Sequence, residues 1–141
     1  MDAKTYLRQL KKLDKLIENK LAEKRHWQDI ALGGGSSFPS GDKVQTSGSQ
    51  QKMADAVCKY INIEEEIDQC IDQLVDTRRE VISTIENLNV DEYDLLHKIY
   101  VQYMTLNEAA DAMDKRSYSW ATTVHGRALQ HVQKILDCRK V

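Results

Sequence analysis

Proline and cysteine are both scarce in this chain of 141 residues. Pro39 is the only proline, and five of the six glycines lie near it, between residues 33 and 48. The three cysteines include no Cys-x-x-Cys pair, so the sequence indicates neither a disulfide framework nor a zinc site. We expect Cys58, Cys70 and Cys138 to pack as small apolar side chains.

Long hydrophobic runs are also missing. No apolar stretch approaches the roughly 18 residues of a membrane span, and the charged N-terminus lacks the apolar core of a signal peptide. With 41% hydrophobic and 30% charged residues, the composition is that of a soluble, folded chain. We therefore expect a cytoplasmic protein that does not contact a membrane and forms one modest domain or two small subdomains.

The chain has no strong excess of charge of either sign. Its net charge of −2 does not by itself indicate a nucleic-acid binder, but the charges are unevenly distributed. Residues 1–31 hold eight Lys and Arg against five Asp and Glu, residues 51–88 hold four against nine, and residues 105–141 hold six against four. The first two segments are therefore complementary in charge, and the C-terminal segment is mildly basic.

No catalytic constellation is present. The acidic residues fall on helix surfaces at ordinary spacing, and no nucleophile can be matched with a base and an orienting group. His125 and His131 are six residues apart and do not share a helix face, so a metal site is not indicated. The glycines at 33–35 lack the Gly-Lys-Ser/Thr that follows in a phosphate loop. The sequence predicts a protein that is not an enzyme and has no cofactor.

Two long helices are predicted in residues 1–88. The first spans about residues 3–31 and ends at Gly33, and a Gly/Ser-rich loop over residues 33–50 follows. The second spans about residues 51–88 and carries a strict seven-residue repeat typical of a coiled-coil seam. The positions of this seam alternate in steps of four and three: Met53, Val57, Tyr60, Glu64, Ile67, Ile71, Leu74, Arg78, Val81, Ile85 and Leu88.

The simplest arrangement of these two helices is an antiparallel hairpin. Their complementary charges favour pairing with each other over self-association of either one. The second helix is the longer, so its remainder must meet the C-terminal segment or another chain. A homodimer through this hairpin is the expected assembly. Glu64 and Arg78 either set the register of the seam or lie at its edge.

Residues 89–141 are predicted to form three helices that include a helix-turn-helix. Asn89 can cap the first helix, with Glu92 three residues on, and Thr105 with Glu108 forms the pattern of a capping box for the second. Ser117 can cap the third. The apolar positions of that third helix are three or four residues apart: Ala121, Val124, Ala128, Val132 and Ile135. Two short capped helices at this spacing suit a unit whose second helix enters a major groove, and they also suit any small helical hairpin.

Several stretches carry a resemblance to known families. Leu-Leu-His-Lys-Ile-Tyr at 95–100, Thr-Leu-Asn-Glu-Ala-Ala at 105–110 and His-Gly-Arg-Ala-Leu at 125–129 resemble region 4 of sigma-70-type transcription factors. The whole chain resembles short phage and prophage proteins of the ArpU kind, which are sigma-like or late-transcription regulators. This second resemblance rests on residues 6–10, on the loop at 40–45 and on residues 47–57. It implies a transcriptional regulator in the cytoplasm of a bacterial host, acting on double-stranded DNA.

The expected DNA-binding residues follow from the resemblance and from the composition of the third helix. Hydroxyls can bond base edges and phosphates, and threonine methyls can contact thymine, whereas cations contact phosphates. The expected contact residues are Lys115, Arg116, Ser117, Tyr118, Ser119, Thr122, Thr123 and Arg127, with Lys134 as a further phosphate contact. A sigma recognition helix usually opens with Arg or Gln where this chain has residues 118–123, so the sigma promoter sequence is not carried over.

Other interpretations of the third helix and of the whole protein stay open at this stage. Trp120 and Tyr118 either wedge against DNA or pack in the core, and Gly126 is expected to permit close approach of another helix. The C-terminal unit alternatively binds RNA polymerase or another regulator without touching DNA. A third possibility is a DNA-packaging recognition subunit, since those also join a helix-turn-helix to a helical hairpin and form rings.

Overall fold

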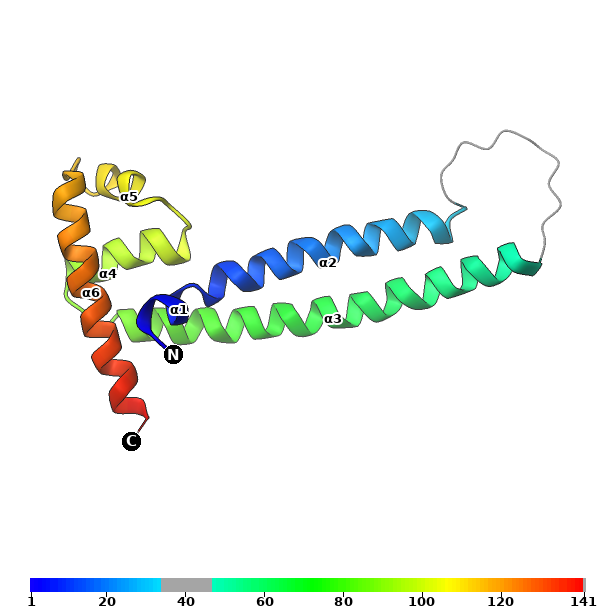
Figure 1. The fold of residues 1–141 in the computed structure, drawn as a ribbon, viewed down its shortest axis with the longest axis horizontal. Coiled ribbons are helices and arrows are strands. Elements are labelled where there is room, and N and C mark those ends of the chain that lie inside the picture. The colour runs from blue at the N-terminus through cyan, green and yellow to red at the C-terminus, as the bar shows by residue number, and fades with distance from the viewer. Residues whose placement is uncertain (34–46, 141) are drawn as a thin grey trace. The chain divides into compact units, whose positions relative to one another are not determined.

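The computed structural model describes residues 1–33 and 47–140, and every regular element in them is helical (Figure 1). The predicted all-α class is therefore confirmed. The elements are α1 (Ala3–Leu7), α2 (Gln9–Ala31), α3 (Ser47–Ile85), α4 (Val90–Leu96), the π-helical turn η1 (His97–Val101), α5 (Leu106–Ala112) and α6 (Tyr118–Arg139). Most of the predicted loop over residues 33–50 lies outside the described residues.

The chain divides into two compact units. One consists of Lys15–Asp72, and the other joins Met1–Asp14 to Gln73–Val141. The sequence placed a boundary at residue 88 instead. The difference arises because the first residues of the chain and the end of α3 share a buried core with α6, in which Tyr6, Leu10, Val81, Ile85 and Val132 lie together.

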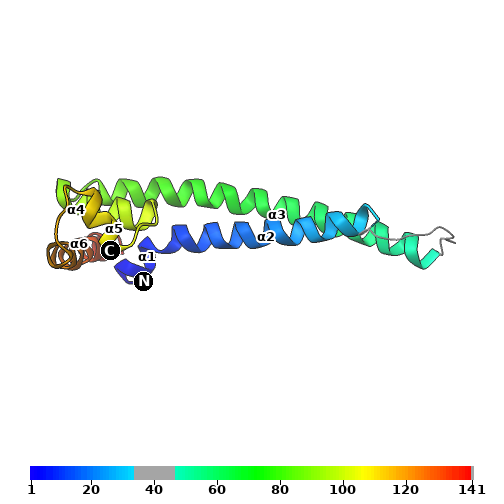
Figure 2. The ribbon, with the colours of Figure 1, turned by 90° about the horizontal axis from the view of Figure 1, so that it is seen from above.

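In the unit Lys15–Asp72, the two long helices run antiparallel and lie side by side in both Figure 1 and Figure 2. Lys20 Nζ lies 2.8 Å from a Glu66 carboxylate oxygen, and Lys24 Nζ lies 2.9 Å from Glu64. The ammonium group of Lys59 lies 5.1 Å from the centre of the Trp27 ring. Opposite charges thus meet along this pair, as the charge distribution along the sequence predicted.

The predicted seam of α3 was only half correct in this unit. Ile67 is buried as expected, but Ile63 is buried in place of Glu64, and Ile71 is 42% exposed. Burying the Glu64 carboxylate in the seam would remove it from water, which is unfavourable for a charge. The buried row of α3 differs from the predicted seam by one residue at every second position. Ile63 is therefore buried in place of Glu64, which lies at the edge of the helix pair and forms an ion pair with Lys24. Ala56 is 1% exposed and continues this shifted seam.

The predicted first helix, residues 3–31, is interrupted at Arg8. The Gln9 side-chain amide donates to the Tyr6 carbonyl at 2.9 Å and so competes with the backbone for that acceptor. The five residues of α1 then pack on α6, where the Ala3 amide donates to the Gln133 side chain at 2.7 Å. The buried Tyr6 hydroxyl lies 3.0 Å from the Thr84 hydroxyl, so neither polar group lacks a partner.

The predicted helix starts in the C-terminal segment are confirmed. The Asn89 side chain accepts from the Glu92 amide, and Thr105 and Glu108 form a reciprocal capping box before α5. The Ser117 side chain accepts from the Trp120 amide at 3.0 Å and caps α6. The predicted apolar face of α6 is buried at four of its five positions, and the fifth is partly buried: Ala121, Val124, Ala128, Val132 and Ile135.

The cysteines do not pack as predicted. Cys58 and Cys138 are exposed, and only Cys70 is partly buried. All three are free thiols. Among residues 1–33 and 47–140, no helix combines the length and the apolar character that a membrane span requires.

Candidate nucleic-acid interface

A tight turn joins α5 to α6. Asp114 and Lys115 both adopt left-handed backbone conformations, with φ of 61° and 56°, which cost an L-residue roughly 1 kcal/mol each. The Arg116 amide donates to the Ala110 carbonyl at 2.9 Å, and the Lys115 amide donates to Asp111 at 3.1 Å. These bonds satisfy carbonyls at the end of α5 and fix the direction in which α6 leaves the turn.

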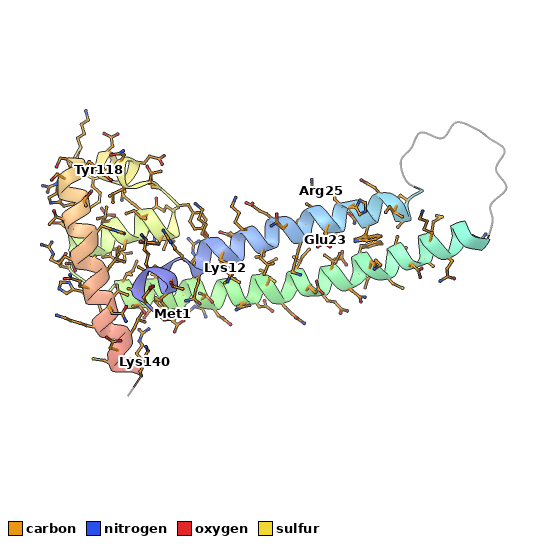
Figure 3. All side chains as sticks on the ribbon, viewed as in Figure 1. Met1, Lys12, Glu23, Arg25, Tyr118 and Lys140 are labelled. Carbon is orange, nitrogen blue, oxygen red and sulfur yellow. The ribbon has the colours of Figure 1, made fainter. Side chains whose placement is uncertain are left out.

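The solvent-facing side of α6 carries small and hydroxyl-bearing residues. Ser119, Thr122, Thr123 and Gly126 are exposed and lie opposite the buried face of the helix. Tyr118 is 58% exposed and lies at the N-terminal end of α6 (Figure 3). The residues expected to face the groove therefore do share one accessible surface.

The hydroxyls on this surface are partly engaged within α6. The Thr122 hydroxyl donates to the Tyr118 carbonyl at 2.9 Å, and the Thr123 hydroxyl donates to the Ser119 carbonyl at 3.1 Å. Each threonine thus uses its proton inside the helix and offers its oxygen as an acceptor. The Ser117 oxygen is likewise occupied as the helix cap. The two threonine oxygens can therefore accept hydrogen bonds from donors on base edges, such as the amino groups of adenine or cytosine.

The cations near the turn are Lys115 and Arg116, and both are exposed. The Arg116 guanidinium carbon lies 4.7 Å from the centre of the Trp120 ring, so the guanidinium covers the outer face of the indole. Trp120 itself packs against the small core of α4, α5 and α6, which agrees with the core interpretation of this residue. A stacked guanidinium keeps its in-plane donors available to a phosphate.

Arg127 is bound by Glu92, a residue for which the sequence pattern indicated another role. Glu92 is 1% exposed, and its carboxylate lies 2.9 Å from Arg127 Nε and 2.8 Å from His131 Nδ1. The sequence pattern identified Glu92 only as the third residue after the Asn89 cap. Its side chain instead turns from α4 to α6, and no local signal distinguishes these two outcomes.

Opposing effects act on the Glu92 carboxyl. Burial raises its pKa, but the hydrogen bonds from His131 and Arg127, together with their charges, outweigh burial, so the pKa lies below its ordinary value of 4.5. The carboxylate is therefore ionised in the folded protein at neutral pH. It fixes α4 against the middle of α6, directly beside the exposed face described above.

Gly126 does not have the role that the sequence suggested. A side-chain carbon built at this position would have nothing within 4 Å, so no helix of the described chain approaches it closely. Glycine inside a helix costs about 1 kcal/mol relative to alanine. No contact within the described residues compensates for this cost.

His125, one residue earlier, pairs with Tyr100 of η1. The Tyr100 hydroxyl lies 2.8 Å from His125 Nε2, and the two rings are stacked at a centroid distance of 5.8 Å. Burial lowers the pKa of His125, and the charges of Lys4 and Arg8 lower it further. Within the part of the chain that the structure describes, no group of three His, Cys, Asp or Glu could hold a metal ion.

The fold and surface described above define an all-α protein with a capped helix pair at its C-terminal end. Residues 35–134 match the family described as a protein of unknown function (DUF1492), and the chain belongs to this family. Searches of curated proteins and of solved structures gave no match.

Proposed function

We propose that this protein is a phage or prophage transcriptional regulator that binds double-stranded DNA in the bacterial cytoplasm. In this proposal α5 and α6 act as a sigma-region-4-like helix-turn-helix within residues 89–141, and α6 enters the major groove. The proposed contacts are Lys115, Arg116, Ser117, Tyr118, Ser119, Thr122 and Thr123, with Lys134 as a further phosphate contact. Arg127 is a weaker candidate because Glu92 already binds it.

The observation that carries the proposal is the exposed glycine on a hydroxyl-bearing face. Gly126 weakens α6 without serving any contact within the described chain. A helix that approaches another molecule closely has a use for such a position, because a side chain there would hold the two surfaces apart. Its neighbours Thr122 and Thr123 offer the acceptors and methyl groups that suit base edges.

The helical pair of α2 and α3 would serve as an arm for dimerisation or for docking on RNA polymerase. The shifted seam of α3 leaves a second row of apolar side chains exposed, which includes Met53, Ile61 and Ile71 at 38%, 44% and 42%. Exposed apolar rows at helical spacing favour association with a second helix. A second copy of the chain is the partner that we propose. Two linked helix-turn-helix units would bind a DNA site with paired half-sites more tightly than one unit does.

One observation favours a different function, a protein-binding regulator that never contacts DNA. Residues 117–126 include no charged side chain, and Arg127 is engaged by the buried Glu92. A surface of this kind is ordinary for binding RNA polymerase or another regulator, whereas DNA affinity depends largely on phosphate contacts. Binding to duplex DNA distinguishes the two functions.

Duplex binding should depend on salt and on sequence. Three exposed cations, Lys115, Arg116 and Lys134, give an expected log–log salt slope of about −3 per protomer, at roughly −0.9 for each phosphate contact. Fluorescence anisotropy with random duplexes and phage-promoter duplexes measures this slope. Arg116→Ala should weaken binding to all sequences alike, and Thr122→Ala should change the sequence preference. Absence of binding to any duplex at low salt would contradict the proposal.

Gly126→Ala should separate stability from binding. The new methyl group meets open space, so the variant should unfold at a temperature about 4 °C higher, as expected for about 1 kcal/mol. If α6 lies in a groove at this position, duplex affinity should fall by about fivefold. Cys138→Ala, at an exposed position near the end of α6, is the control that should change neither quantity. Unchanged affinity in Gly126→Ala would place the DNA contact elsewhere.

A further inference from the structure

A hollow of about 270 Å³ lies in the unit that joins Met1–Asp14 to Gln73–Val141, and its lining shares no residue with the exposed face of α6 that the proposed function uses. Its lining includes Lys4, Arg8 and Lys11 from the N-terminal segment, Tyr100 and Tyr103 from η1 and the residues after it, and His125 from α6. Ile99 and Leu106 complete its apolar part. Side chains from four separate segments thus converge on one space.

The lining of this hollow carries an excess of positive charge. Lys4 lies in α1, Arg8 at the break between the two helices and Lys11 in α2, and all three line the hollow. Among the described residues, none of the three forms an ion pair with a carboxylate, and no acidic side chain lines the hollow. Two acidic residues of the N-terminal segment have other partners: Asp2 accepts from the Thr5 amide, although its charge also interacts with that of Arg8, and Asp14 accepts a hydrogen bond from the Tyr103 hydroxyl. Three like charges at one mouth repel one another, and a bound anion would relieve that repulsion.

The polar groups inside the hollow are held in place. The π-helical turn η1 carries Tyr100 to His125, where the hydroxyl and the imidazole nitrogen are 2.8 Å apart. Short π-helical turns occur often at functional sites. Tyr103 has a φ of 62°, a conformation that is unfavourable for an aromatic residue, so its position at the lining is maintained by its surroundings.

We propose that this hollow binds a phosphate group, with Lys4, Arg8 and Lys11 neutralising its charge and His125 donating a hydrogen bond to it. A multiply charged anion matches three cations better than a single carboxylate does, and the guanidinium of Arg8 fits two phosphate oxygens at once. At about 270 Å³ the space is large enough to admit a phosphate group. The source is either a free phosphate or a backbone phosphate of a duplex.

Titration with inorganic phosphate, followed by NMR of the His125 ring and the Tyr100 hydroxyl region, tests the site directly. Sodium chloride holds the ionic strength constant. Saturable shifts of both residues are expected, together with a rise in the pKa of His125, because the charges that lower it would then be neutralised. Arg8→Gln and Lys11→Gln should each weaken phosphate binding at least fivefold. Lys12→Gln, which alters an exposed cation of α2 outside the lining, should not (Figure 3).

A second arm identifies the source. If Arg8→Gln lowers duplex affinity about fivefold and Lys12→Gln does not, the occupant is a backbone phosphate. If Arg8→Gln weakens the binding of inorganic phosphate but not of the duplex, the occupant is a free phosphate. This conclusion holds whether or not the protein binds DNA. The proposal is overturned if Arg8→Gln changes neither phosphate binding nor duplex binding, or if acetate binds as tightly as phosphate.

Discussion

Arg127→Ala is expected to lower the free energy of unfolding by about 2–3 kcal/mol, a large effect for a half-exposed arginine. The reason lies in its partner, because the Glu92 carboxylate is 1% exposed and would keep only His131 as a hydrogen-bond donor. Chemical denaturation followed by circular dichroism measures the change. Arg116→Ala, which removes an exposed arginine that stacks on Trp120 but has no ion pair in the described residues, should cost less than about 1 kcal/mol.

The double variant Glu92→Met, Arg127→Ala is the decisive comparison. Methionine is close to glutamate in volume and carries no charge, so the double variant leaves no unpaired buried carboxylate and should be at least as stable as Arg127→Ala alone. If the cost of Glu92→Met is the same in the Arg127→Ala background as in the unchanged protein, the two residues are not energetically coupled and the prediction is wrong.

The same pair predicts a dependence on pH. The pKa of Glu92 is lowered in the folded protein, so its contribution to stability is present above its ordinary value of 4.5 and is lost as the pH falls through the folded value. Removing Arg127 removes one cause of this lowering. The loss of stability in acid should then begin at a higher pH in Arg127→Ala than in the unchanged protein.

This result would also decide how DNA-binding data are interpreted. The sequence identified Arg127 as a phosphate contact, but the structure gives it a structural partner. A loss of duplex affinity in Arg127→Ala would therefore follow from a shifted α6 as readily as from a lost contact. Arg116 is the better residue for testing phosphate binding, because its guanidinium lies on the Trp120 ring and forms no ion pair with any described residue.

Ile67→Ala and Ile71→Ala are expected to have very different costs, although both residues occupy the heptad seam that the sequence predicted. Ile67 is 6% exposed between α2 and α3, and its truncation should cost about 2–4 kcal/mol. Ile71 is 42% exposed, and its truncation should cost less than about 1 kcal/mol. In a Trp120→Phe background, Trp27 is the only tryptophan, so its fluorescence reports unfolding of the α2–α3 pair.

The same two variants test the proposed dimer. Sedimentation equilibrium should show that Ile71→Ala weakens self-association, while its unfolding at high dilution stays near that of the unchanged protein. If Ile67→Ala and Ile71→Ala lower the free energy of unfolding equally, the buried row of α3 is the seam that the sequence predicted and not the shifted one. A ring-like mass would favour a DNA-packaging subunit instead of a dimeric regulator.

The helix starts could be predicted because their causes are local. Asn89, Thr105 and Ser117 each bond an amide three residues ahead, so the residues that decide the cap stand together in the sequence. The same holds for the buried face of α6, whose small and apolar residues recur at helical spacing. The break at Arg8 was missed because Gln9, an ordinary helix residue, happens to bond the Tyr6 carbonyl.

The sequence by itself determined the all-α class, the caps and the capped helix pair, because helical hydrogen bonds and caps join residues within a few positions of each other. Only the tertiary structure decided which side of α3 is buried. That choice depends on the position of Glu64, which stays in contact with water at the edge of the helix pair and forms an ion pair with Lys24 there. It also decided that Glu92 binds Arg127 and that Lys4, Arg8 and Lys11 meet His125. Those partners lie 35 or more residues apart in the chain, where sequence spacing carries no information about distance.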